Sequence, residues 1–173
     1  MTKLNRDMGA VFLIAWMTGF ASPGANAEAE RLNVLGIEIT IKTDGQKTGG
    51  AMALVEAVVP PGGGPPLHIH SREDELFYVL EGKFKFWHGE TEMVLDSGDS
   101  TFLHRNGRHT YQNVGAAPGR LLTVISPAGF EGFFREVSKR RLSAPKDMNE
   151  LNALASTYGL NLSARRLAHN KLD

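Results

Sequence analysis

Four side chains that could bind one metal ion are found in two short stretches of the sequence. His68 and His70 are two residues apart, and Glu75 follows them after a short turn. Residues two apart on a β-strand point to the same side of a sheet, so both imidazoles would face one side. His109, which opens another expected strand, is the best candidate for a fourth ligand. Together these residues predict a site with three nitrogen ligands and one oxygen ligand.

The chain contains no cysteine, so any bound metal must be held by nitrogen and oxygen atoms. A set of three histidines and one carboxylate suits Fe(II), Mn(II), Ni(II), Co(II), Cu(II) or Zn(II), and the sequence does not choose among them. One or two coordination positions of such an ion would stay open for water, dioxygen or substrate. Two alternatives stay open. In the first, the histidines bind no metal and lie either in the packed core or on an exposed strand face. In the second, the metal has a purely structural role.

The other histidines and the charged turn are weaker candidates for this site. His104 would be either a hydrogen-bond donor or an acid/base beside the metal, or a surface residue in a turn. His88, in a turn, and His169, near the C-terminal end, are expected to be solvated. The charged turn Arg72-Glu73-Asp74 is expected to be solvated as well.

Several aromatic and apolar residues are candidates for the wall of a cavity. Phe77 and Val79 share strand parity with Glu75, and Tyr111 shares it with His109, so all three are expected to point inward. Plain core packing explains them equally well. The aromatic segment 130–134 would close one end of the domain, mediate a dimer, or pack in the core.

Short runs of apolar or alternating residues between turn residues predict an all-β domain with eight or more strands. Gly36–Lys42 and Lys83–Trp87 show the alternation most clearly, and the turn Thr43-Asp44-Gly45 follows the first of them. Pro60–Pro66 is too rich in proline and glycine for a central strand and predicts a loop that leads to His68. Further strands are expected at 50–59, 77–80, 92–95, 101–103, 110–114 and 120–126. This number and spacing suits a closed barrel.

The C-terminal part has a different pattern. Pro145 and Asp147 suit the first turn of a helix, which Gly159 would end. The apolar residues at helical spacing are Leu151, Leu154, Ala155 and Tyr158. We expect this helix to pack outside the barrel, and the polar residues 161–173 to fray.

The N-terminal residues are typical of an export signal. Lys3 and Arg6 precede the apolar stretch 9–21, and Ala25-Asn26-Ala27 offers small residues for cleavage after Ala27. The alternatives are a buried N-terminal helix or a retained membrane anchor. The signal predicts an exported protein, either periplasmic or secreted.

The length of 173 residues indicates a single domain, with a signal peptide at 1–27, a barrel at 28–145 and a helical tail at 146–173. Nineteen basic residues balance nineteen acidic ones, so the composition gives no reason to expect nucleic-acid binding. After signal cleavage no membrane association is expected either.

Two motifs in the sequence resemble those of the cupin superfamily. The first consists of Gly62, five residues, His68-Ile69-His70, four residues, Glu75, six residues and Gly82. The second consists of Gly98-Asp99, His104, Asn106, His109 and Asn113. His104 replaces a usual proline and Asn106 a usual glycine, but asparagine tolerates positive φ, so the turn should survive. The resemblance is close over residues 55–126. Within the superfamily, the sequence is most similar to the small single-domain cupins of the conserved-barrel type, which include quercetin dioxygenase-like proteins.

The resemblance implies a double-stranded β-helix, or jelly-roll barrel, with a metal bound inside by His68, His70, Glu75 and His109. It also implies a metal-dependent dioxygenase that acts on a small aromatic or enolic compound. In that reaction Glu75 would be a metal ligand or would accept the substrate's hydroxyl proton. The alternatives are a non-catalytic protein that binds a small ligand, or another cupin enzyme such as an isomerase or an oxalate-type decarboxylase. The resemblance to cupins also implies a homodimer that forms through the barrel edges.

Overall fold

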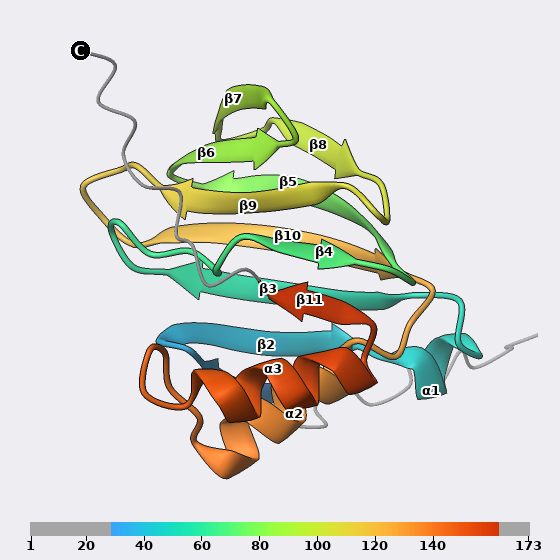
Figure 1. Cartoon of the computed structure of the whole chain (residues 1–173). Helices are drawn as coiled ribbons and strands as arrows, with labels where there is room; N and C mark the ends of the chain where they lie inside the picture. The colour runs from blue at the N-terminus through green and yellow to red at the C-terminus, as the bar shows by residue number, and fades with distance from the viewer. Residues whose placement is uncertain (1–28, 163–173) are drawn as a thin grey trace, which may run out of the picture.

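The computed structural model describes residues 29–162, which form two antiparallel β-sheets and three helices. The six-stranded sheet contains, in spatial order, β1 (Glu30–Val34), β2 (Ile37–Thr43), β3 (Ala53–Val59), β10 (Gly119–Ser126), β5 (Asp74–Glu81) and β8 (Ser100–Leu103). The five-stranded sheet contains β11 (Leu160–Leu162), β4 (His68–His70), β9 (Arg108–Asn113), β6 (Lys83–His88) and β7 (Thr91–Asp96). The prediction of an all-β barrel is confirmed (Figure 1).

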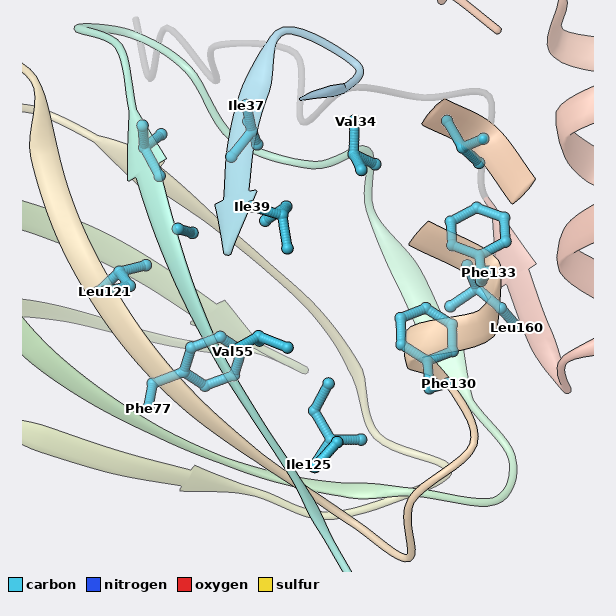
Figure 2. Packing of buried hydrophobic residues seen from close by; sticks show 14 of the residues in the cluster. Val34, Ile37, Ile39, Val55, Phe77, Leu121, Ile125, Phe130, Phe133 and Leu160 are labelled. Atoms are coloured by element: carbon cyan, nitrogen blue, oxygen red, sulfur yellow. The ribbon is translucent and has the colours of Figure 1, made fainter. Parts of the chain in front are cut away.

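The inner faces of the two sheets enclose the hydrophobic core. Along β10, for example, Leu121, Thr123 and Ile125 are buried, whereas Leu122 and Val124 between them are partly exposed. This alternation follows from the two-residue period of a β-strand. Figure 2 shows apolar side chains from β2, β3, β5 and β10 converging on a common interior, with Phe130 and Phe133 approaching from the helical side.

The helices are α1 (Gly45–Thr48), α2 (Glu131–Arg140) and α3 (Met148–Thr157). In Figure 1, α2 and α3 lie at the opposite side of the barrel from β7 and β8; α2 contacts β1, and α3 contacts β11. The buried residues of α3 are Leu151, Leu154 and Ala155. The predicted helix outside the barrel is thus confirmed. None of the helices within residues 29–162 is long and apolar enough to cross a membrane.

Four elements differ from the sequence-based expectation. The turn at 43–45 is followed by the short helix α1, because the Asp44 side chain accepts a hydrogen bond from the Lys47 N–H and caps it. Neither β1 nor α2 was expected. Residues 161 and 162 do not fray but belong to β11, which pairs with β4. The predicted signal peptide and His169 lie outside the described residues, and the domain boundaries remain predictions.

Candidate metal centre

The four candidate ligands come from three strands in two different sheets. His68 and His70 lie on β4, and His109 lies on the neighbouring β9, where it is the register partner of His68. Glu75 lies on β5 in the other sheet, between Ile125 of β10 and Leu103 of β8. The centre therefore lies inside the barrel, where the two sheets face each other.

The cluster is compact and shielded from solvent. One potential ligand atom from each of His68, His70, Glu75 and His109 lies within 4.8 Å of every other. The exposed fractions of these residues are 7%, 1%, 5% and 2%. Buried titratable groups are retained only where they are paired or coordinate a metal, so this arrangement requires charge compensation at its centre.

Each histidine is held in the orientation that a metal ligand needs. The Nδ1 atom of His68 lies 2.7 Å from the Pro66 carbonyl oxygen, and that of His109 lies 2.9 Å from the Gly107 carbonyl oxygen. The Nδ1 atom of His70 lies 3.3 Å from a Glu73 carboxylate oxygen. These oxygens only accept hydrogen bonds, so each Nδ1 carries a proton, and Nε2 is the atom of each ring that can bind a metal. Such outer hydrogen bonds typically orient metal-binding histidines.

The contacts of Glu75 indicate a positive charge between its carboxylate and the imidazoles. Its Oε2 atom lies 2.9 Å from His109 Nε2 and 3.5 Å from His70 Nε2. A carboxylate oxygen and a nitrogen lone pair repel each other at these distances, so a proton or a metal cation must lie between them. The donor set thus suits a divalent transition metal, and the four residues could hold one.

The pKa values favour the ligand forms of two of these residues. Burial, together with the neighbouring His109 and His70, lowers the pKa of His68 to about 3, so this ring is neutral at physiological pH. Burial opposes ionisation of Glu75, but His70 and His109 outweigh it and lower its pKa to about 2. For His70, burial is outweighed by Glu75 and Glu73, which raise its pKa. A metal would therefore displace a proton from His70.

The prediction of a solvated charged turn is wrong for Glu73. Its side chain is 5% exposed and contacts the His70 ring, because the turn folds back under β4. The sequence signal that could have revealed this contact is a carboxylate three residues after a candidate histidine ligand. The neighbouring Asp74 accepts two hydrogen bonds from the Arg105 side chain, and Arg72 donates to the Thr157 carbonyl oxygen.

The second motif forms the tight turn that was expected before His109. Asn106 has a φ of 65°, the left-handed conformation that glycine or asparagine tolerates best. Its N–H donates to the His70 carbonyl oxygen at 2.6 Å, which ties this turn to β4. His104 is exposed and packs on Phe102, in agreement with the surface interpretation. His88, at the end of β6, is half-buried.

The proline- and glycine-rich loop at 60–66 runs along β9 and positions His68. The Gly62 N–H donates to the Asn113 carbonyl oxygen, and the Asn113 N–H donates to the Gly63 carbonyl oxygen, both at 2.9 Å. The Thr110 hydroxyl donates to the Pro65 carbonyl oxygen at 2.7 Å. These bonds fix the backbone next to Pro66, whose carbonyl orients the His68 ring.

A largely apolar cavity of about 90 Å³ adjoins the cluster. Of the predicted wall residues, Phe77 and Tyr111 line it, but Val79 does not. Val79 lies four residues beyond Glu75 on β5, about 13 Å along the strand, and is packed in the core instead. The other lining residues are Val34, Leu35, Ile37, Ile39, Val55, Ala57, Pro65, Pro66, His68, His70, Glu75, Thr123, Ile125, Phe130, Phe133, Phe134, Leu160 and Leu162.

The aromatic segment at 130–134 covers this cavity as the start of α2. The Phe130 ring stands edge-on to the His70 ring, with 4.4 Å between the ring centroids, and stacks on Phe133 at 5.3 Å. Figure 2 shows Phe130 and Phe133 next to Leu160 of β11. Leu160 and Leu162 were not predicted to line the site, because three residues are too few to carry a periodic signal.

Comparison with known proteins agrees with this geometry. Residues 55–125 match the family described as cupin domain. The chain is 31% identical over 67 residues to the oxalate-binding protein of Thermotoga maritima, covering 39% of this chain and 55% of that protein. It spans 63%, 55% and 52% of the lengths of three curated relatives.

Two solved structures show the same architecture. A predicted oxalate decarboxylase from Thermotoga maritima is 26% identical, with a TM-score of 0.52, and the match covers 57% of this chain and 91% of that one. KdgF from Halomonas sp. is 20% identical, with a TM-score of 0.55, and the match covers 62% of this chain and 94% of that one. The second likeness concerns the fold alone.

Proposed function

Because this chain belongs to the cupin superfamily, we propose that it binds one divalent transition metal and uses it on a small organic compound. The observation that carries the proposal is the buried cluster of three histidines and one carboxylate beside an apolar cavity. The reaction we propose is dioxygenation of a small aromatic or enolic compound. A bound metal would supply a Lewis acid and open coordination positions at the end of the cavity.

The protein residues have distinct roles in this proposal. His68, His70 and His109 hold the metal through Nε2, because their Nδ1 atoms are engaged elsewhere. Glu75 either completes the ligand set, for which its low pKa keeps it ionised, or accepts the hydroxyl proton of the substrate. Phe130 and Phe133 exclude water from the cluster.

A second candidate function is ligand binding without turnover. The relative from Thermotoga maritima is named an oxalate-binding protein, and the chain spans 55% of its length at 31% identity. In such a protein the metal and the cavity would capture a small ligand. Metal-dependent capture without dioxygen consumption would distinguish this function from the first.

The location and assembly belong to the proposal as well. We place the mature protein outside the cytoplasm, supported by the apolar stretch 9–21 and the small residues before the cleavage point at Ala27. The apolar side chains of Leu76, Tyr78 and Phe102 are exposed on neighbouring strands β5 and β8, which supports a homodimer. The balance of basic and acidic residues argues against a nucleic-acid partner.

Elemental analysis of protein purified without added metal or chelator, followed by oxygen-uptake assays with small enols and phenols, tests the proposal. About one equivalent of metal together with substrate-dependent oxygen uptake would support a dioxygenase. Metal without uptake would favour the ligand-binding alternative. His70→Ala and His109→Ala should each abolish metal uptake, and stoichiometric metal in both variants would refute the ligand assignment.

The proton-accepting role of Glu75 has its own test. Glu75→Gln keeps a weaker oxygen ligand but cannot accept a proton, so metal content should fall less than turnover. Unchanged turnover would remove Glu75 as the base.

A further inference from the structure

The cavity beside the cluster has a partly exposed mouth. Most of its lining residues are buried, including the cluster residues His68, His70 and Glu75. The lining residues that are partly exposed are Leu35, Pro65, Pro66, Tyr111, Phe134 and Leu162. Apart from Tyr111 of β9, they belong to the turn between β1 and β2, the loop before β4, α2 and β11. A ligand would therefore enter between these four segments, with the cluster behind them.

Leu35 lies in the tight turn between β1 and β2. Val34 pairs with Ile37, so Leu35 and Gly36 are the two central residues of this turn. Figure 2 shows Val34 and Ile37, on either side of the turn, with their side chains toward the hydrophobic interior. Leu35 itself packs against the core and lines the cavity, yet it stays partly exposed. Its side chain is thus at the boundary between the cavity and solvent.

The backbone of Leu35 has a conformation that leucine normally avoids. Its φ is 53° and that of Gly36 is 84°, and two-residue turns in which both φ angles are positive favour Asn-Gly. In the left-handed conformation, the Cβ of an ordinary residue comes too close to the following carbonyl oxygen. Within residues 29–162, the other non-glycine residues with positive φ are Asn106, whose type tolerates it, and Arg141, which ends α2. Neither explanation applies to Leu35.

The apolar side chain of Leu35 has a use at this position that asparagine would not serve. Residues that break a local rule are commonly found at ligand sites, where a contact made by the side chain compensates the strain. Together with Phe134 and Leu162, Leu35 makes the mouth of the cavity apolar. The segments that carry these side chains are connected, because α2 contacts β1 and α3, and α3 contacts β11.

We propose that Leu35 is a specificity-determining residue, which holds the hydrocarbon end of the ligand at the mouth while the oxygen atom of the ligand lies at the metal cluster. The inference rests on the proposed metal site and narrows its substrate class to phenols or enols with an apolar substituent at the end away from the oxygen. A polar substituent at the mouth would lose water without gaining a hydrogen-bond partner from these side chains.

Phenol and 4-propylphenol form a matched pair for the test, because they differ only in a hydrocarbon chain opposite the hydroxyl. Protein loaded with Zn(II), which is redox-inert, is titrated with each compound by calorimetry. Each buried methylene strengthens apolar binding roughly fourfold. We therefore expect wild type to bind 4-propylphenol at least fivefold more tightly than phenol, even if the chain is only partly buried.

The role of Leu35 is tested with Leu35→Asn, which suits the left-handed turn but removes the apolar side chain. The preference for 4-propylphenol over phenol should fall at least threefold. Leu35→Met keeps an apolar side chain of similar length and should retain the preference. Leu32→Asn is the control, because Leu32 is a partly buried leucine of β1 that packs against the core and lies outside the cavity lining. Its preference should equal that of wild type.

A role of Leu35 in core packing alone predicts a different result. Leu35→Asn would then lower the melting temperature of the protein but leave the ratio of the two affinities unchanged. That outcome would refute the proposal, as would a loss of preference in Leu32→Asn as large as that in Leu35→Asn.

Zinc content measured before each titration separates this inference from the function on which it rests. If Zn(II) does not bind stoichiometrically to wild type, the proposed metal site fails and the inference fails with it. If Zn(II) binds but wild type does not prefer 4-propylphenol, only the inference fails.

Discussion

The chemistry of the candidate centre depends on three hydrogen bonds made by atoms that do not face the metal position. The acceptors for the Nδ1 atoms of His68, His70 and His109 are two backbone carbonyls and the Glu73 carboxylate. Backbone acceptors are fixed by the strands and turns themselves. Glu73 is the one side chain in this role, and it is therefore the partner that a substitution can remove.

Glu73→Gln should weaken metal binding without removing a ligand. The neutral amide orients and polarises the His70 ring less than a carboxylate does, and losing such an outer partner typically costs 10- to 100-fold in affinity. Competition with a chromophoric chelator would measure the change. Glu90→Gln, at a side chain that is 99% exposed, is the control. Equal affinities for wild type and Glu73→Gln would show that Glu73 is not needed to orient His70.

Gly64→Ala should destabilise the fold at the loop that precedes His68. An added Cβ would overlap the Tyr111 carbonyl oxygen, so backbone would have to move, which we expect to lower the free energy of unfolding by about 2 kcal/mol. Gly62→Ala is the control from the same loop. It has a φ of 71° and open space around its Cβ position, so only backbone strain of about 1 kcal/mol is expected. Chemical denaturation measures both, and similar losses would contradict a steric cause.

At the scale of elements, the sequence predicted those features that local patterns encode. The two-residue period correctly placed His68 and His70 on one face of β4, and the left-handed turn at Asn106 was expected from its residue type. The C-terminal helix α3 was predicted from helical spacing. These features depend on neighbouring residues, so a single sequence contains enough information to identify them.

The elements that were not predicted depend on distant parts of the chain. β11 has three residues and is a strand because β4 offers it an unpaired edge. α2 begins at an aromatic cluster without a side-chain cap, and its start is held by Glu131, which accepts hydrogen bonds from the Gly45 and Gly129 N–H groups. The burial of Glu73 likewise results from tertiary packing. Local periodicity cannot reveal such contacts.

The ion cluster on the outer face of the six-stranded sheet gives a prediction for strands β2, β3 and β10. Glu56 on β3 contacts Lys42 on β2 at 2.6 Å and Arg120 on β10 at 2.6 Å. Hydrogen bonding to Lys42, helped by Arg120, outweighs burial and lowers the pKa of Glu56 below its ordinary value of 4.5. The contribution to stability is therefore present above pH 4.5 and is lost as the pH falls through the lower pKa of the folded state.

Glu56→Gln should accordingly reduce the free energy of unfolding by about 1 kcal/mol at pH 7, a modest value because both cations are partly exposed. The difference from wild type should shrink as the pH falls below 4.5. Urea denaturation at several pH values measures it, with Glu81→Gln as a control at a more exposed carboxylate 3.9 Å from Arg120. A difference that stays constant with pH would contradict the assigned charge effect.

At the scale of the whole molecule, the candidate ligands connect the two sheets. The three histidines belong to the five-stranded sheet, and Glu75 belongs to the six-stranded sheet. A metal bound to all four would hold the sheets together. Because the unfolded chain cannot present this arrangement, metal binding should be coupled to the stability of the barrel.

Metal addition should raise the melting temperature of metal-free protein. At a free metal concentration 100 times Kd, the folded state gains about 2.7 kcal/mol. For a domain of this size that corresponds to roughly 5–10 °C. Scanning calorimetry with and without metal measures the shift, which a chelator should reverse. His109→Ala should show no shift, and an equal shift in that variant would place the stabilising metal elsewhere.

The pairing of β11 with β4 also affects the order in which the candidate metal centre is assembled. Leu160 pairs with His70, about ninety positions earlier in the chain, so the histidine strand is made long before the strand that covers its edge. A domain of this size folds as a unit, so the edge of β4 and the adjoining cavity stay open until residues 160–162 have been made and can pair. Metal loading should be fastest before this pairing forms, and slower once β11 has covered the edge of β4.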